Sequence, residues 1–304
     1  MKNKRLYLLS FLFVFLLAIF TSCGGRNTFT LTILHTNDWH GVLKDVPKYA
    51  TLIKAVRAET PNVLLLDGGD IYRRGPYEEF MGALETDIMN AMSYDALTFG
   101  NNDYPPDDDE LADLSHHPIL QNANFPVLAA NVTIDGVVLD GFAPYTIINV
   151  AGKRVAVIGV TSLKPRLRGY DVARRATFVD PIRTVNIITA ETKPLSDIQI
   201  VLSHAGDEAD VQLRGVSAVI GADFHTVRRQ PFIIKDGKHE IPLVEAGGEN
   251  DHYLGRLDLT FKKVKGEWVL QSFEGRLLSV AEVLPDAEIQ AIIDSYAALM
   301  RDAA

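Results

Sequence analysis

Short apolar runs alternate with amphipathic segments along the first part of the chain. Each run is about the length of one buried strand, and each following segment spaces its apolar positions as one face of a helix. The strands are expected at residues 29–35, 62–67 and 95–100, and the helices at residues 46–59, 77–92 and 107–120. Buried strands followed by helices predict β-α units around a largely parallel sheet.

The second part of the chain is richer in β-branched residues and contains two hairpin signals. Ala151-Gly152 joins two apolar runs within residues 145–160, and Asp236-Gly237 joins two more within residues 232–246. Further strands are expected at residues 197–203, 216–221 and 253–278, and helices at residues 180–191 and 286–303. No linker or repeat interrupts residues 29–304, so we expect one α/β domain with two sheets.

The first 22 residues have the pattern of a secretory signal. Lys2, Lys4 and Arg5 precede fifteen uncharged residues, which are followed by the small residues Thr-Ser-Cys-Gly-Gly. Cys23, the only cysteine, stands where a bacterial lipoprotein carries its lipid, so we expect a lipid anchor there and a tether at residues 23–28. A retained anchor helix is the alternative, although the apolar run is shorter than the roughly 20 residues a spanning helix needs. We therefore expect an exported protein held in the cell envelope, at the outer membrane or the periplasmic face.

The acidic charge limits the classes of partner. Removing residues 1–22 with their three basic side chains changes the formal net charge from −9 to −12. Such a surface argues against binding to a nucleic acid polymer, which depends on positive charge. It leaves room for a small phosphorylated substrate, because a bound cation can set the charge inside a site.

Five of the predicted strands end in side chains that can bind a cation. These side chains are Asp38, His40, Asp70, Asn101, His204, Asp223 and His225. Each has an ordinary alternative, because Asp and Asn are common in turns and a histidine after a buried strand is often only a hydrogen-bonded neighbour. Their recurrence after successive strands favours one shared site, since ligands gather beyond the carboxyl ends of parallel strands.

The types of side chain narrow the choice of metal. Histidine, aspartate and asparagine without cysteine suit zinc, manganese or iron. Mixed nitrogen and oxygen ligands with a shared carboxylate also suit two ions about 3.5–4 Å apart, as in phosphoryl-transfer sites. The sequence therefore predicts a site for two divalent metal ions.

The ordered motifs LTILHTNDWHG, DGGDIYRRG, GNND, IVLSHAGD and IGADFHT resemble those of calcineurin-like metallophosphoesterases. More narrowly, residues 29–275 are similar to the catalytic domain of the 5′-nucleotidase and UDP-sugar hydrolase branch. The resemblance implies an α/β fold built as a four-layer α/β/β/α sandwich. It also implies hydrolysis of phosphomonoesters, 5′-nucleotides among them, by a hydroxide held between two divalent ions.

The same resemblance implies a role for each metal-binding position. Asp38, His40 and His225 match the ligands of the first metal, and Asp70 matches the aspartate shared by both ions. Asn101 and His204 match ligands of the second metal, and Asp223 stands where the family has a histidine ligand. A carboxylate at that position adds negative charge and favours a harder metal such as manganese.

Two positions depart from the family's catalytic pair. Asn102 stands where the family has its catalytic histidine, and Pro105 where it has the aspartate that orients that histidine. Asn102 can donate a hydrogen bond to a phosphate oxygen but cannot transfer a proton. The alternative to an active phosphoesterase is therefore a non-catalytic or partner-dependent metal-binding lipoprotein.

The remaining candidates concern substrate binding. Arg73 and Arg74 follow Asp70 and can clamp a phosphate, or they can belong to a solvated loop. His252 is a candidate substitute acid. The resemblance covers the catalytic domain, whereas in the nucleotidase branch a second domain binds the base. We therefore expect that the substrates are small and varied phosphoesters, or that a separate protein recognises the nucleotide.

Overall fold

The structure, a computed structural model, describes residues 27–104, 114–134, 136–162 and 177–303. The predicted signal segment, Cys23 and Pro105 lie outside the described residues, as does part of the helix predicted at 107–120. Among the described helices, none is both long enough and apolar enough to cross a membrane.

The first of two six-stranded sheets combines parallel and antiparallel strands in the order β15-β14-β1-β2-β3-β4. Strands β1 to β4 pair in parallel, and the β14-β15 hairpin adds to the β1 edge in antiparallel register. The strands are β1 (Thr28–Thr36), β2 (Val63–Asp67), β3 (Ala96–Thr98), β4 (Val127–Leu128), β14 (Tyr253–Val264) and β15 (Glu267–Ser279).

The second six-stranded sheet has the order β12-β13-β11-β10-β8-β7. Its four inner strands are parallel, and each edge is an antiparallel hairpin that turns where Ala151-Gly152 and Asp236-Gly237 predicted. The strands are β7 (Tyr145–Val150), β8 (Lys153–Thr161), β10 (Ile198–His204), β11 (Ala218–Gly221), β12 (Phe232–Asp236) and β13 (His239–Val244). A small third sheet joins β5 (Val132–Ile134) to β6 (Val137–Val138) and β9 (Thr177–Phe178).

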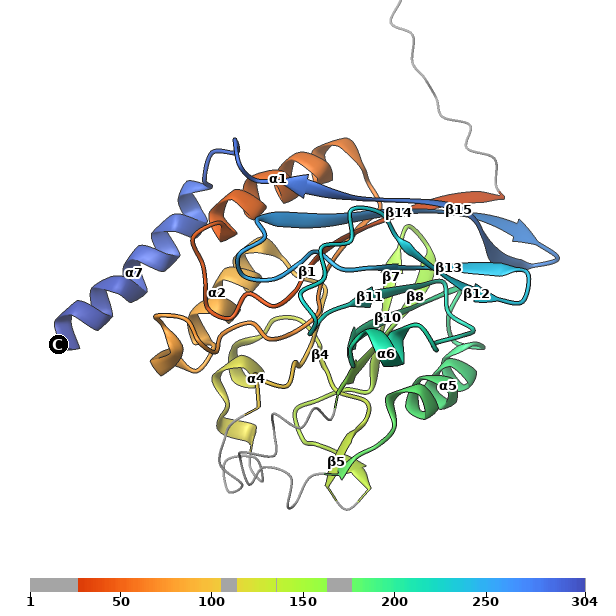
Figure 1. Cartoon of the computed structure of the whole chain (residues 1–304), viewed down its shortest axis with the longest axis horizontal. Coiled ribbons are helices and arrows are strands. Elements are labelled where there is room, and N and C mark those ends of the chain that lie inside the picture. The colour runs from red at the N-terminus through yellow and green to blue at the C-terminus, as the bar shows by residue number, and fades with distance from the viewer. Residues whose placement is uncertain (1–26, 105–113, 135, 163–176, 304) are drawn as a thin grey trace, which may run out of the picture.

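The two large sheets pack face to face, with helices on their outer faces (Figure 1). Because successive strand residues point to opposite faces, Leu64 and Leu66 enter the core between the sheets while Leu65 packs under the helices. One outer face carries α1 (Val46–Glu59), α2 (Ala83–Met92) and α7 (Ala287–Ala303), and the other carries α5 (Pro181–Thr192) and α6 (Asp207–Asp210). The fold is thus the expected four-layer α/β/β/α sandwich.

Two predicted helices are shorter than their apolar patterns indicated. The helix expected at residues 77–92 divides into η1 (Glu78–Phe80) and α2, because Met81 and Gly82 adopt left-handed backbone angles. The described end of the helix expected at 107–120 forms η2 (Leu114–His116) and α4 (Pro118–Asn122). A proline lacks the backbone donor for a continuing helix, so Pro118 begins a new one.

The core between the sheets should dominate the stability of this domain. Leu257 is fully buried there, whereas Leu284 is 80% exposed in the segment before α7. Leu257→Ala should destabilise the protein by about 2–5 kcal/mol, since it removes apolar contacts and leaves a cavity. Leu284→Ala, the control, should change the stability by less than about 0.5 kcal/mol. Urea denaturation monitored by circular dichroism checks this, and equal effects of the two variants would contradict the assignment of the core.

Candidate metal centre

The loops that follow β1 and β2 continue the pairing of these strands beyond the sheet. The Asp38 amide donates to the Gly69 carbonyl at 2.8 Å, and the His40 amide donates to the Asp70 carbonyl at 2.9 Å. This backbone ladder holds Asp38, His40 and Asp70 at the same edge of the first sheet. His204, the last residue of β10, and the loop after β11 meet them from the second sheet.

The backbone is unusual at most of the predicted metal-binding positions. Their φ angles lie in the left-handed region, which residues other than glycine rarely adopt because it costs free energy. The residues are Asp38 (52°), His40 (48°), Asp70 (60°), Asp223 (80°) and His225 (55°). Backbone strain of this kind concentrates at functional sites, where the surrounding structure holds it in place.

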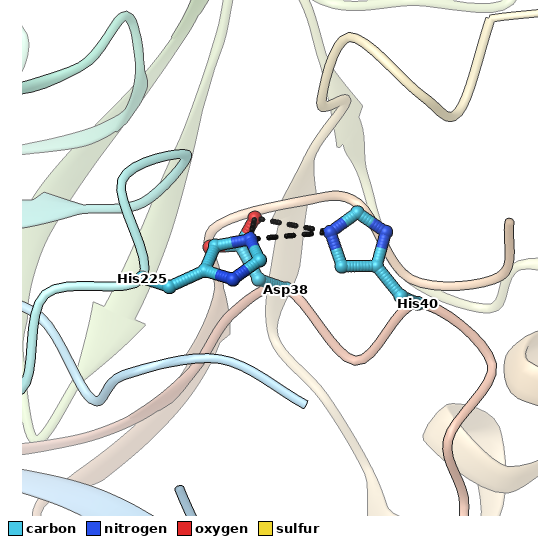
Figure 2. Close-up of side chains that lie close together, drawn as sticks. All are labelled: Asp38, His40 and His225. Atoms are coloured by element: carbon cyan, nitrogen blue, oxygen red, sulfur yellow. Dashed lines mark hydrogen bonds and ion pairs between the residues drawn. The ribbon is translucent and has the colours of Figure 1, made fainter. Parts of the chain in front are cut away.

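Asp38, His40 and His225 form one group of metal-binding atoms (Figure 2). His225 Nε2 lies 3.3 Å from Asp38 Oδ1, and His40 Nε2 lies 3.2 Å from His225 Nε2 and 3.8 Å from the same aspartate oxygen. Figure 2 shows the two imidazole rings approaching each other beside the carboxylate. Three ligand atoms therefore surround one position that a cation could occupy.

Asp38, Asp70 and His204 form a second group that shares Asp38 with the first. His204 Nε2 is 3.4 Å from Asp70 Oδ2, 4.0 Å from Asp38 Oδ1 and 3.8 Å from Asp223 Oδ1. Asp70 Oδ2 is also 3.7 Å from His40 Nε2, so this carboxylate contacts both groups as well. Two adjacent positions linked by carboxylates match the geometry of a dinuclear site.

Several of these buried atoms have no hydrogen-bond partner within the described part of the chain. They are Asp38 Oδ1, Asn101 Oδ1 and His204 Nε2. His204 Nδ1 lies 2.7 Å from the Gly68 carbonyl and donates to it, so the lone pair of Nε2 points toward the carboxylates. Unsatisfied buried ligand atoms are costly unless a further group satisfies them, and a divalent cation would do so. The residues present therefore fit metal binding.

The pKa of His204 also indicates a site that favours a cation. Burial lowers its pKa, but the Asp70, Asp38 and Asp223 carboxylates outweigh burial and raise the pKa well above its ordinary value. The carboxylates thus favour a positive charge at His204 Nε2. A metal ion would supply that charge and displace the proton.

The segment after β3 holds the Asp70 carboxylate through hydrogen bonds. The Asn102 backbone amide donates to Asp70 Oδ1 at 2.7 Å, and its side-chain amide donates to Asp70 Oδ2 at 2.5 Å. Asn101, its neighbour, is buried with only 3% of its surface exposed. The structure therefore brings Asn102 to the metal cluster, where it orients a carboxylate by hydrogen bonds.

Asp103 is a supporting residue that the sequence did not identify. Its carboxylate is fully buried and accepts from the backbone amides of Asp70 (2.7 Å), Ile71 (2.8 Å) and Gly100 (2.9 Å). It thereby joins the loops after β2 and β3. An aspartate among turn-forming residues carries no sequence signal of this role, because only the fold brings the three amides to it.

Arg73 and Arg74 have different neighbours. Arg74 Nη2 lies 3.4 Å from Asn102 Oδ1, whereas the Arg73 side chain is mostly buried, with its Nε 3.9 Å from Glu78 Oε1. Arg74 thus contacts Asn102, which in turn contacts the metal cluster. His252, considered as a substitute acid, pairs instead with Asp45 through its Nδ1.

Glu249 is a second residue that sequence reasoning missed. Its Oε2 lies 3.2 Å from His225 Nδ1, on the side of the ring opposite the metal-binding nitrogen. A carboxylate in this position fixes the tautomer and orientation of a metal-binding histidine. The Gly-Gly-Glu segment that carries it has no pattern that would predict the contact.

Comparison with known proteins identifies the family of this chain. The family model for the calcineurin-like phosphoesterase matches residues 31–228. The chain is 29% identical to the 5′-nucleotidase of Rattus norvegicus, and the alignment covers 88% of this chain and 52% of the relative. The chain thus spans about half the length of the curated relatives it matches.

Two solved structures show the same fold. The 5′-nucleotidase precursor of Thermus thermophilus superposes with a TM-score of 0.77 at 26% identity, covering 90% of this chain and 59% of that one. The calcineurin-like phosphoesterase YfkN of Bacillus subtilis superposes with a TM-score of 0.73 at 22% identity, covering 88% of this chain and 97% of that one. With the family match over most of the chain, these likenesses establish that the protein belongs to the calcineurin-like phosphoesterase family.

Proposed function

We propose that the protein is a metal-dependent phosphoesterase that hydrolyses phosphomonoesters, with 5′-nucleotides as the candidate natural substrates. The observation that carries the proposal is the pair of groups of histidines and carboxylates that share the buried Asp38 at the ends of strands from both sheets. The name of the rat relative, 5′-nucleotidase, supports the choice of substrate.

The metal-binding atoms divide into two sets in this proposal. Asp38, His40 and His225 would hold one divalent ion, and Asp70 would be shared between the two ions. Asn101, His204 and Asp223 would be the further ligands of the second ion, and zinc, manganese or iron would suit these nitrogen and oxygen donors. Two ions bound there would supply positive charge that stabilises the attacking and leaving oxygens of phosphoryl transfer.

The chain's own residues position these groups and the substrate. Asn102 orients Asp70 through two hydrogen bonds, and Asp103 fixes the loop on which Asp70 stands. Arg74 is the cation beside Asn102 that can pair with phosphate oxygens, and Arg73 is a weaker candidate because it faces Glu78. Binding and orientation are thus the contributions of this chain to catalysis.

The proposal also covers export, membrane attachment and a partner protein. We infer export by residues 1–22 and attachment to a membrane through lipid on Cys23, on the basis of the sequence pattern. A separate nucleotide-recognition protein that contacts the base is the partner included in this proposal.

Replacing Asp70 tests the proposed activity. Asp70 contacts both ligand groups, so Asp70→Ala should lower metal content and reduce phosphate release by more than about 10²-fold, beyond the loss expected for an outer-shell partner. Phosphate release from nucleotides and an aryl phosphate, with manganese or zinc added, provides the measurement. Asp294→Ala on exposed α7 is the matched control and should match the wild type. Equal release by the wild type and Asp70→Ala with every metal would refute the proposal.

Replacing Glu249 tests the metal site without measuring activity. Glu249→Gln keeps the shape of the side chain but removes the negative charge beside His225 Nδ1, so metal affinity should fall by about 10–100-fold. Competition with a chromophoric chelator measures the affinity. Glu267→Gln on β15, which is exposed, should leave the affinity unchanged. An unaltered affinity in Glu249→Gln would show that this contact does not support the metal site.

Replacing Cys23 tests the membrane attachment. In a bacterial host that processes lipoproteins, the wild type should incorporate labelled fatty acid and sediment with membranes. Cys23→Ser should incorporate no label, because the lipid is carried by the thiol. Labelling that persists in Cys23→Ser, or a wild type without label, would exclude the anchor.

A further inference from the structure

The first strand begins beside a turn that is rich in lysine. Thr28, the first residue of β1, pairs with Lys262 near the end of β14, and the Lys263 amide donates to the Asn27 carbonyl at 2.8 Å. The chain then turns at Lys265-Gly266 and returns as β15. Figure 1 shows this turn, in blue, on the same side of the molecule as the red start of β1. The chain therefore enters the domain next to the β14–β15 turn.

Two aromatic rings and two ammonium groups pack together beside this turn. The Phe29 and Trp268 rings meet edge to face, with their centroids 6.2 Å apart. Lys153 Nζ, at the start of β8, lies 4.7 Å from the centroid of the Trp268 ring, and Lys263 Nζ lies 5.9 Å from it. Cation–π attraction holds the ammonium groups over the ring. The cluster thus includes residues from both large sheets at this end of the sandwich.

The charge of this region is opposite to that of the chain as a whole. Lys262, Lys263 and Lys265 are exposed, and Lys153 is half-buried. Residues 262–268 and Lys153, which we call the basic turn, hold four lysines and one glutamate, so their formal charge is +3. The chain without residues 1–22 has a formal net charge of −12, because the net charge of −9 loses three basic side chains. The basic turn therefore complements an anionic surface, although the protein is acidic.

The predicted lipid site is close to the basic turn along the chain. Thr28 follows Cys23 by five residues, and an extended chain covers at most about 3.6 Å per residue, so Thr28 lies within about 18 Å of Cys23. A tether that short gives a weak contact a high effective concentration. Lipid on Cys23 would therefore hold the basic turn near the membrane surface.

Resting on the lipid anchor proposed above, we propose that the basic turn docks on the anionic phospholipid surface that the anchor enters. In the docked state the lysine ammonium groups contact the headgroup phosphates, because positive side chains are attracted to anionic lipids. The Trp268 ring lies at the level of the headgroups, where tryptophan is enriched in membrane proteins. Val264, which is 43% exposed between the lysines, adds an apolar contact at the same surface.

Docking at this end fixes the direction in which the metal centre faces. The basic turn lies beside the start of β1, whereas Asp38 and His40 follow the end of the same strand. At about 3.3 Å per residue, the nine residues of β1 separate its two ends by about 26 Å. The metal centre is thus held on the aqueous side of the domain, where soluble phosphoesters reach it.

The two tryptophans of the chain report on the docked state. Trp268 belongs to the basic turn, whereas Trp39 stands between Asp38 and His40 and is only 3% exposed. The lipidated wild-type protein is reconstituted in vesicles of phosphatidylglycerol and phosphatidylcholine that carry a spin label on some headgroups. The spin label should quench the fluorescence of Trp268. In Trp268→Phe, whose folding circular dichroism checks, the remaining fluorescence of Trp39 should not be quenched.

Removing two exposed lysines tests the electrostatic contribution. Each lysine near an anionic surface favours docking about fivefold, so Lys262→Gln/Lys265→Gln should lower the ratio of docked to undocked protein about 25-fold. Lys263 is kept because it packs on Trp268, whose fluorescence is measured. The matched control, Lys44→Gln/Arg301→Gln, removes two positive charges from exposed positions outside the basic turn and should be quenched like the wild type. Vesicles of phosphatidylcholine alone should quench the wild type as weakly as the mixed vesicles quench Lys262→Gln/Lys265→Gln.

The contrary outcomes separate this inference from the anchor on which it rests. If the wild type carries lipid but Trp268 is not quenched, docking of the basic turn is wrong while the anchor stands. If Lys262→Gln/Lys265→Gln is quenched like its control, the lysines do not hold the domain on the membrane and the inference is wrong. If the wild type acquires no lipid, the anchor fails and this inference fails with it, whereas the phosphoesterase proposal rests on the metal centre and is unaffected.

Discussion

Carboxylates and histidines are buried together where the ends of the two sheets meet, and their charges must be balanced there. Asp38 and Asp70 have 0% and 2% of their surface exposed, and the ion pairs of both in the described residues are with histidines. Two carboxylates that close cannot both remain ionised in a dry site unless positive charge accompanies them. Bound divalent cations would meet this requirement, so the site's geometry and its need for metal have the same physical origin.

The surrounding backbone is organised to keep these charges in place. The ladder between the loops after β1 and β2 sets the distance between Asp38 and Asp70. Asp103, in the loop after β3, accepts two hydrogen bonds from the loop after β2 and one from its own loop. These contacts offset the cost of the left-handed backbone angles at the ligand positions. A rigid frame of this kind reduces the reorganisation needed when substrate binds. Asn102 adds two hydrogen bonds to Asp70, and the Arg74 guanidinium lies beside Asn102.

Much of the fold and of the site was predictable from the sequence. The period of the apolar positions identified α1 over its whole length. The turn signals Ala151-Gly152 and Asp236-Gly237 identified both edge hairpins of the second sheet. The same reasoning placed Asp70 and His204 at strand ends, because a side chain at the end of a parallel strand lies at a known edge of the sheet. It failed where helices are interrupted, at Met81-Gly82 and at Pro118, since an apolar pattern continues through a break that backbone geometry imposes.

The sequence by itself determined which side chains stand at the ends of the strands, and so which metal-binding groups the protein can assemble. Only the tertiary structure decided how they are used. It separates Arg74 from Arg73, joins Glu249 to His225 and gives Asp103 its three amides, all through contacts between segments that have no fixed spacing along the chain. Local periodicity encodes strands and helices, whereas the approach of loops depends on how whole sheets pack. That packing placed the Asn102 amide beside the buried Asp70 carboxylate and the Arg74 guanidinium beside Asn102.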